Sequence, residues 1–124
     1  MLTALTLQMR HTTFPWKTIK HEIERSNESP IEKLIDYIVE SKLSESLHAA
    51  TMLTNLRIGR SKNFSRNDSE LTVEHIKQTD SIVFNSYSSE YSESWQKKCE
   101  SNEIISTFKY VISKRLRWVQ NAES

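Results

Sequence analysis

The chain has 124 residues, of which 36% are hydrophobic and 27% are charged, and this balance predicts one soluble globular domain spanning residues 1–124. The formal net charge of +1 argues against bulk electrostatic attraction to nucleic acid or to an anionic membrane. The single glycine excludes a P-loop and a dinucleotide-binding fingerprint, because each of these motifs needs several glycines.

Residues 1–13 carry a weak pattern with two interpretations. Leu5, Leu7 and Met9 alternate with polar residues as in an edge strand, whereas Leu2, Leu5 and Met9 also fit one side of a helical turn. The segment lacks the basic start and the continuous apolar stretch of a signal peptide. We therefore expect an edge strand or a loosely ordered arm here.

The first predicted helix begins near Pro15, because proline suits a first helical position, where the backbone N–H has no partner in any case. Trp16, Ile19 and Ile23 follow at helical spacing and form the expected buried stripe. This helix should end near Asn27.

A second helix should begin at Ser29. Ser29 and Glu32 form a capping-box pattern, with Pro30 at the first helical position between them. Apolar residues then recur at the helical period. The expected buried face comprises Ile31, Leu34, Ile35, Ile38, Val39 and Leu43.

Residues 44–52 leave helix and strand open. A helix would continue the spacing of Leu43, Leu47 and Ala50. A strand, which we favour for the second half of 47–58, would follow the later alternation. That alternation comprises Met52, Thr54, Leu56 and Ile58.

Two apolar runs, Leu71–Glu74 and Ile82–Tyr87, bracket a polar turn at residues 77–80 and predict an antiparallel hairpin. Apolar and polar residues also alternate in Ser94–Cys99, which predicts a short further strand. The expected sheet is therefore a three- to four-stranded antiparallel meander.

The strongest periodicity lies in Ile104–Val119, whose apolar residues follow one helical stripe. Ser101 is the predicted N-cap, and Glu103 lies in the first turn, where a carboxylate favours the helix dipole. The face expected to pack on the sheet, beside the second helix, comprises Ile104, Phe108 and Ile112. The predicted fold class is α+β, with two N-terminal helices and a long C-terminal helix packed on one face of the sheet.

Several fragments of the chain together resemble a set of small bacterial α+β proteins of unknown function. The fragments are Ser29–Ile31, Ala50 to Met52 with Leu56 and Ile58, Ile82–Phe84 with Tyr87, Trp95 before Cys99, and Leu116–Trp118. The resemblance covers the chain from about Trp16 to Trp118. It implies a bacterial origin and a compact domain, and it implies no activity and no catalytic residues.

No metal site or cofactor is expected, because no two of the four histidines lie three or four residues apart with a carboxylate beside them. Cys99 could act as a nucleophile with His75 or His48 if its pKa were lowered, and Lys97 and Lys98 flank it. A cysteine that packs as a small hydrophobic residue is the commoner case, so we expect no catalytic residue.

Two basic groups, one in residues 57–66 and one in 115–118, are candidate binding sites. If they meet in the fold, they offer phosphate contacts and aromatic rings for stacking; otherwise they are solvated loop and helix-end cations. Residues 67–103 contain eight acidic and three basic residues, a local balance of −5, which suits oriented docking to a charged partner. The candidate partner-binding residues are Arg57, Arg60, Lys62, Phe64, Arg66, Tyr91, Arg115, Arg117 and Trp118.

We expect a non-enzymatic bacterial protein-binding domain, in its most concrete form an immunity- or antitoxin-type inhibitor. The single cysteine excludes an internal disulfide and fits a reducing compartment, so the cytoplasm is the expected location. No apolar run approaches the ~20 residues that a membrane span needs. The alternatives are a small nucleic-acid-binding protein using residues 57–66 and a small cysteine-dependent enzyme built around Cys99.

Overall fold

The computed structural model describes residues 12–25, 29–52, 55–62, 64, 70–87 and 94–119. Its helices are α2 (Trp16–Arg25), α3 (Ser29–Glu40) and α4 (Ile104–Tyr110), and its strands are β1 (His48–Met52), β2 (Asn55–Gly59), β3 (Glu70–Ile76), β4 (Ser81–Tyr87) and β5 (Ser94–Glu100). Short 3₁₀ turns occupy Leu43–Glu45 and Ser101–Glu103, and a π-helical segment occupies Val111–Arg115. The predicted α+β class, with two N-terminal helices and one C-terminal helix, is confirmed.

In the described part of the chain the sheet has five strands in the order β1-β2-β3-β4-β5, and each strand pairs antiparallel with the next one along the chain. The prediction of three to four strands is therefore wrong by at least one strand. Residues 48–59 contain two strands, in which Ala49 pairs with Ile58. The helical interpretation of 44–52 holds only for the 3₁₀ turn that ends at Glu45. Alanine is depleted in strands, so Ala49 and Ala50 weakened the sequence signal that would have predicted β1.

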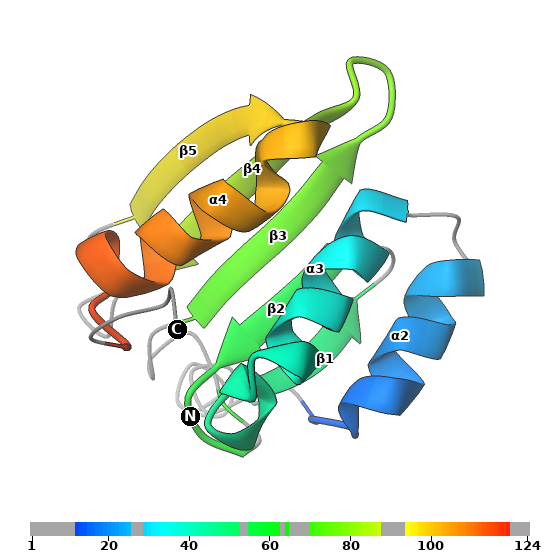
Figure 1. Ribbon diagram of the computed structural model, residues 1–124, viewed down its shortest axis with the longest axis vertical. Helices are drawn as coiled ribbons and strands as arrows, with labels where there is room; N and C mark the ends of the chain where they lie inside the picture. Colours follow the sequence, from blue (N-terminus) through cyan, green and yellow to red (C-terminus); the bar gives the residue numbers. More distant parts are fainter. Residues whose placement is uncertain are drawn as a thin grey trace, which may run out of the picture.

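The three described α-helices lie on one face of the sheet, as predicted (Figure 1). α2 packs on β1 and α3, α3 also packs on β3 and α4, and α4 packs on β5. The buried layer between helices and sheet contains the predicted Ile31, Leu34, Phe108 and Ile112. The result is a two-layer domain with one main hydrophobic core.

The first two helices begin where proline predicts. The backbone N–H of Ile19 donates to the Pro15 carbonyl at 3.1 Å, and the indole N–H of Trp16 donates to the Leu47 carbonyl at 3.0 Å. α3 begins at Ser29, although its side chain lies outside the described part. Val39 is 47% exposed and does not belong to the buried face, because it lies about 100° further round the helix than buried Ile38.

The C-terminal helix differs from the prediction at its start. Glu100, not Ser101, is the N-cap of the 3₁₀ turn that leads into α4. The Glu100 carboxylate accepts the backbone N–H of Glu103, and the Glu103 carboxylate accepts the backbone N–H of Glu100 at 3.1 Å. This reciprocal capping box uses two carboxylates where the sequence pattern pointed to a hydroxyl.

The same helix also ends earlier than predicted. After Tyr110 the backbone widens into the π-helical segment, and the Leu116 N–H donates to the Val111 carbonyl at 2.8 Å, five residues back. Arg117 takes a left-handed conformation (φ 57°), which ends the helical path before Val119. The predicted single helix is thus three successive helical forms over Ser101–Arg115.

Candidate functional site

The strand register brings the two predicted basic groups to the same end of the sheet. Ile58 pairs with Leu71, Leu71 with Ser86, and Ser86 with Trp95, so the end of β2 is level with the start of β5. The Arg115 guanidinium lies 5.2 Å above the centre of the Trp95 ring. Figure 1 shows the red end of the C-terminal helical segment beside the start of β5.

Five exposed cations define this surface, which we call the basic end: Arg60, Lys62, Lys114, Arg115 and Arg117. Three strand spacings of about 4.8 Å separate β2 from β5, so the two groups lie on the order of 14 Å apart across the sheet. That distance is within the width of one protein-binding patch. The register, rather than any contact between the two groups, therefore brings these described cations to the same end of the sheet.

Arg57 does not join the basic end. Its guanidinium Nη1 donates to Glu70 Oε2 at 2.6 Å, and the Thr72 hydroxyl donates to the same oxygen at 3.3 Å. These side chains lie on the face of the sheet opposite the helices, because Leu56 and Ile58, their neighbours on alternate positions, point into the main core. The positive charge of Arg57 is thus paired with the buried carboxylate of Glu70.

Phe64 is fully buried, and its ring lies directly against Gly59 of β2. A Cβ at position 59 would overlap the ring, which explains a glycine at this point of the strand. Gly59 alternates with Ile58, so the ring covers the face of the sheet away from the helices. The stacking role predicted for Phe64 is incompatible with this buried position.

The structure distinguishes the other predicted residues by exposure. Arg115 and Arg117 are exposed, whereas Trp118 is half-buried against the core, and its backbone N–H donates to the Ile112 carbonyl at 2.8 Å. Arg66 and Tyr91 lie outside the described residues. Of the predicted set, Arg60, Lys62, Arg115 and Arg117 are exposed at one end of the sheet.

Sequence reasoning missed a cationic and aromatic strip beside the basic end. Lys97 lies 5.8 Å from the Tyr110 ring centre, and Lys109 lies 5.3 Å from that of Tyr37. A cation over an aromatic ring is held by the ring quadrupole at about 0.5–1 kcal/mol on an exposed surface. The alternation of Trp95 and Lys97 in β5 was a visible sign that this lysine lies on the helical side of the sheet.

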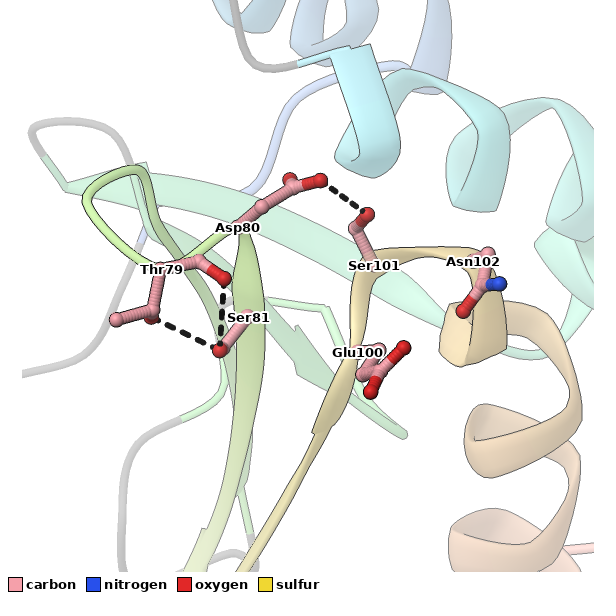
Figure 2. Close-up of a pocket in the computed structure, with 6 residues that line it drawn as sticks. All are labelled: Thr79, Asp80, Ser81, Glu100, Ser101 and Asn102. Atoms are coloured by element: carbon pink, nitrogen blue, oxygen red, sulfur yellow. Dashed lines mark hydrogen bonds between the residues drawn. The ribbon is translucent and has the colours of Figure 1, made fainter.

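The opposite end of the sheet carries an open polar pocket of about 370 Å³. It lies where the β3–β4 turn meets the β5–α4 junction, as Figure 2 shows. The lining residues are Thr79, Asp80, Ser81, Glu100, Ser101 and Asn102.

Asp80 connects the two segments around this pocket. His75 Nε2 lies 2.8 Å from Asp80 Oδ1, and the Ser101 hydroxyl donates to Asp80 Oδ2 at 2.9 Å. Hydrogen bonds with His75 and then Ser101 lower the pKa of Asp80 below its ordinary value. A serine nucleophile needs a histidine between serine and aspartate. Here the aspartate lies in the middle, so the cluster is suited to joining the hairpin to α4 and not to acyl transfer.

Cys99 lacks the surroundings of a nucleophile. Burial raises the pKa of its half-buried thiol, and the opposing hydrogen bond with Thr107 is a smaller effect. His75 pairs with Ile82, and Ile82 pairs with Cys99, so two strand spacings, on the order of 10 Å, separate the histidine from the thiol. The hypothesis of a cysteine-dependent enzyme therefore gains no support from this geometry.

Within the described ranges, no three side chains of His, Cys, Asp or Glu come together in a way that could hold a metal ion. No helix in this part of the chain is both long and apolar enough to cross a membrane. The chain matches no protein-family model, and no curated protein or solved structure was found to match it. The site must therefore be interpreted from its own geometry.

Proposed function

We propose that this protein is a non-enzymatic protein-binding domain that docks onto an acidic surface of a partner protein through its basic end. An inhibitor of the immunity or antitoxin type is the most concrete form of this function. The observation that carries the proposal is the convergence of Arg60 and Lys62 with Arg115 and Arg117 at one end of the sheet.

The charge distribution over the described residues supports oriented docking. The exposed carboxylates Asp80, Glu100 and Glu103 lie at the other end of the strands, beside the polar pocket. A molecule with net charge near zero but separated charges has an electric dipole, which aligns it as it approaches a charged partner. The basic end would therefore meet an acidic partner first.

A protein partner is favoured over nucleic acid because most of the described aromatic rings near the basic end are buried or lie beneath a cation. Single-stranded nucleic acid is bound by stacking its bases on exposed rings. Phe64 is buried, Arg115 covers Trp95, and Trp118 is half-buried. Tyr110 is 48% exposed, and the Lys97 ammonium lies 5.8 Å from its ring centre. A surface rich in cations and poor in accessible rings suits carboxylates on a protein surface, which guanidinium groups bind in a bidentate manner.

The test uses the full-length protein as bait in a lysate of the source organism, with and without nuclease treatment, followed by binding measurements with the purified partner. Charge reversal of Arg60 and Arg115 should weaken the partner's affinity by at least about tenfold, or ~1.4 kcal/mol. The matched control reverses two exposed cations on the helices, Lys17 and Lys33, and should leave the affinity within about twofold.

Two outcomes would contradict the proposal. Equal weakening by the control variant would show that net charge matters and the basic end does not. Binding that disappears on nuclease treatment, and whose affinity falls steeply with salt, would favour the nucleic-acid alternative.

A further inference from the structure

The two edges of the sheet are not equivalent. The outer edge of β1 is partly covered, because the Phe14 backbone N–H donates to the Ala49 carbonyl at 3.1 Å in an isolated antiparallel bridge. β5 is the last strand on the other side, and it pairs with β4 along its whole length from Ser94 to Glu100. No described segment pairs with its outer edge, which Figure 1 shows at the border of the sheet.

The outward-facing backbone groups of β5 follow from the ladder. The Ser101 N–H donates to the Asp80 carbonyl at 3.1 Å, so this pair is hydrogen-bonded toward β4. Hydrogen-bonded and non-hydrogen-bonded pairs alternate in an antiparallel ladder. Trp95, Lys97 and Cys99 therefore face β4 with their backbone groups. The residues that direct their N–H and C=O groups outward are Ser94, Gln96, Lys98 and Glu100.

One of these outward groups is already used. The Glu100 N–H is bound by the Glu103 carboxylate in the capping box, which confirms the outward direction and closes the edge at that end. Ser94, Gln96 and Lys98 remain as a row that a further strand could pair with. The part of the β5 edge that is open to pairing thus begins beside the basic end and stops before the polar pocket.

Cations flank this edge on both faces. Lys98 lies on the face away from the helices, whereas Lys97 lies on the helical face, where Arg115 also covers Trp95. An added strand with carboxylates would meet an opposite charge on either face, worth about 0.2–1 kcal/mol for each cross-strand pair. A second copy of this chain is a poor occupant, because full-length antiparallel pairing of two β5 strands would place Lys97 opposite Lys97.

We propose that the outer edge of β5 binds an extended acidic segment of the partner protein, which pairs with it as a sixth strand. The inference rests on the proposed function for the class of partner and adds the mode of binding. Backbone hydrogen bonds to Gln96 and Lys98 supply the affinity, and the cations on both faces select carboxylate side chains.

The test uses the full-length, nitrogen-15-labelled protein and a short capped peptide of alternating valine and glutamate. Hydrogen exchange of the Gln96 and Lys98 amides should slow by about tenfold or more on binding, while the Trp95 and Lys97 amides, already bonded to β4, should change little. The matched peptide of alternating valine and lysine should not bind. The same acidic peptide, N-methylated throughout its centre, should also fail to bind.

A proline substitution tests the role of the outer β5 edge in binding without disrupting the fold. Gln96→Pro removes an outward N–H and no β4 hydrogen bond, so the protein should stay folded and lose at least about tenfold in peptide affinity. Gln96→Ala, which removes the side-chain bond to Asn85 but keeps the N–H, should bind normally.

The possible outcomes show whether the edge proposal or the proposed function fails. If the acidic peptide does not bind, or if Gln96→Pro binds it as well as Gln96→Ala does, the edge proposal is overturned, and these lysines serve only to prevent aggregation. Peptide binding that maps to the basic end overturns the edge proposal and leaves the proposed function intact. A natural partner that is lost on nuclease treatment overturns the proposed function instead.

Discussion

The Arg57–Glu70 ion pair gives the sharpest stability prediction for this fold. The Arg57 side chain is 12% exposed and the Glu70 side chain is 0% exposed, and their closest atoms are 2.6 Å apart. Arg57→Met keeps the length and apolar stem of the side chain but removes the cation. The Glu70 carboxylate then stays within the protein without its charged partner.

The expected loss follows from burial. Removing one member of a buried ion pair costs about 3–5 kcal/mol, because the remaining charge loses its close counter-charge in a medium of low polarity. A solvent-exposed pair would cost about 0–1 kcal/mol. A domain of this size has a total stability of about 5–15 kcal/mol, so Arg57→Met should remove a large part of it.

Urea unfolding followed by tryptophan fluorescence measures the effect. With an m-value of about 2 kcal/mol/M, a loss of 4 kcal/mol lowers the unfolding midpoint by about 2 M. The double variant Arg57→Met/Glu70→Met replaces both charges with apolar groups and should recover most of the loss, since well-packed apolar replacements of buried pairs are often neutral or stabilising. A double-mutant cycle then gives the coupling energy of the pair.

A loss below about 1 kcal/mol in Arg57→Met would refute the reasoning, because that is the range of a solvated pair. A double variant that is less stable than Arg57→Met would also refute it. Glu70 would then stabilise the fold through contacts other than the one with Arg57.

Three further predictions address the rest of the molecule. Gly59→Ala should lower the free energy of unfolding by about 1–3 kcal/mol, because the new Cβ overlaps the Phe64 ring, and adding Phe64→Leu should recover part of that loss in the same urea assay. Asp80, whose pKa is lowered from 3.8, stabilises the fold above that pH, and the contribution is lost as the pH falls through the lower folded pKa. Asp80→Asn should therefore reduce stability at neutral pH, by a difference that shrinks below pH 3.8; an unchanged difference would exclude a role for the charge. Iodoacetamide should label Cys99 at least about tenfold more slowly in the native than in the urea-unfolded protein, and rapid native labelling would contradict the raised pKa.

Local patterns predicted the elements whose physics is local. Proline at the start of α2 and α3, the apolar stripe through Ile31 and Ile38, and the β3–β4 hairpin all depend on neighbours within a few residues. The sequence signal of β1 was weak because Ala49 and Ala50 are both small. Ala49 is buried under α2, whereas Ala50 is buried on the opposite face of the sheet, where it pairs with Arg57. The π-helical segment has no sequence signature of its own in this chain.

The candidate site was only partly predictable because it depends on contacts between distant parts of the chain. Charge could be read from Arg60 and Arg115, but their convergence depends on the register of four strands. Burial of Phe64 and pairing of Arg57 depend on what covers the far face of the sheet, which periodicity within one strand does not encode. The binding function itself stays a prediction.

The strictly sequential order of the strands has a consequence for folding kinetics. Each hairpin closes a short loop, so the sheet can assemble stepwise at a low cost in chain entropy. The contact between α3 and α4, where Tyr37 meets Phe108 edge to face, joins distant parts of the chain. We expect this contact to form after the rate-limiting barrier, so that Phe108→Leu accelerates unfolding and hardly changes the refolding rate. A chevron plot in which the refolding arm falls instead would place α4 in the folding nucleus.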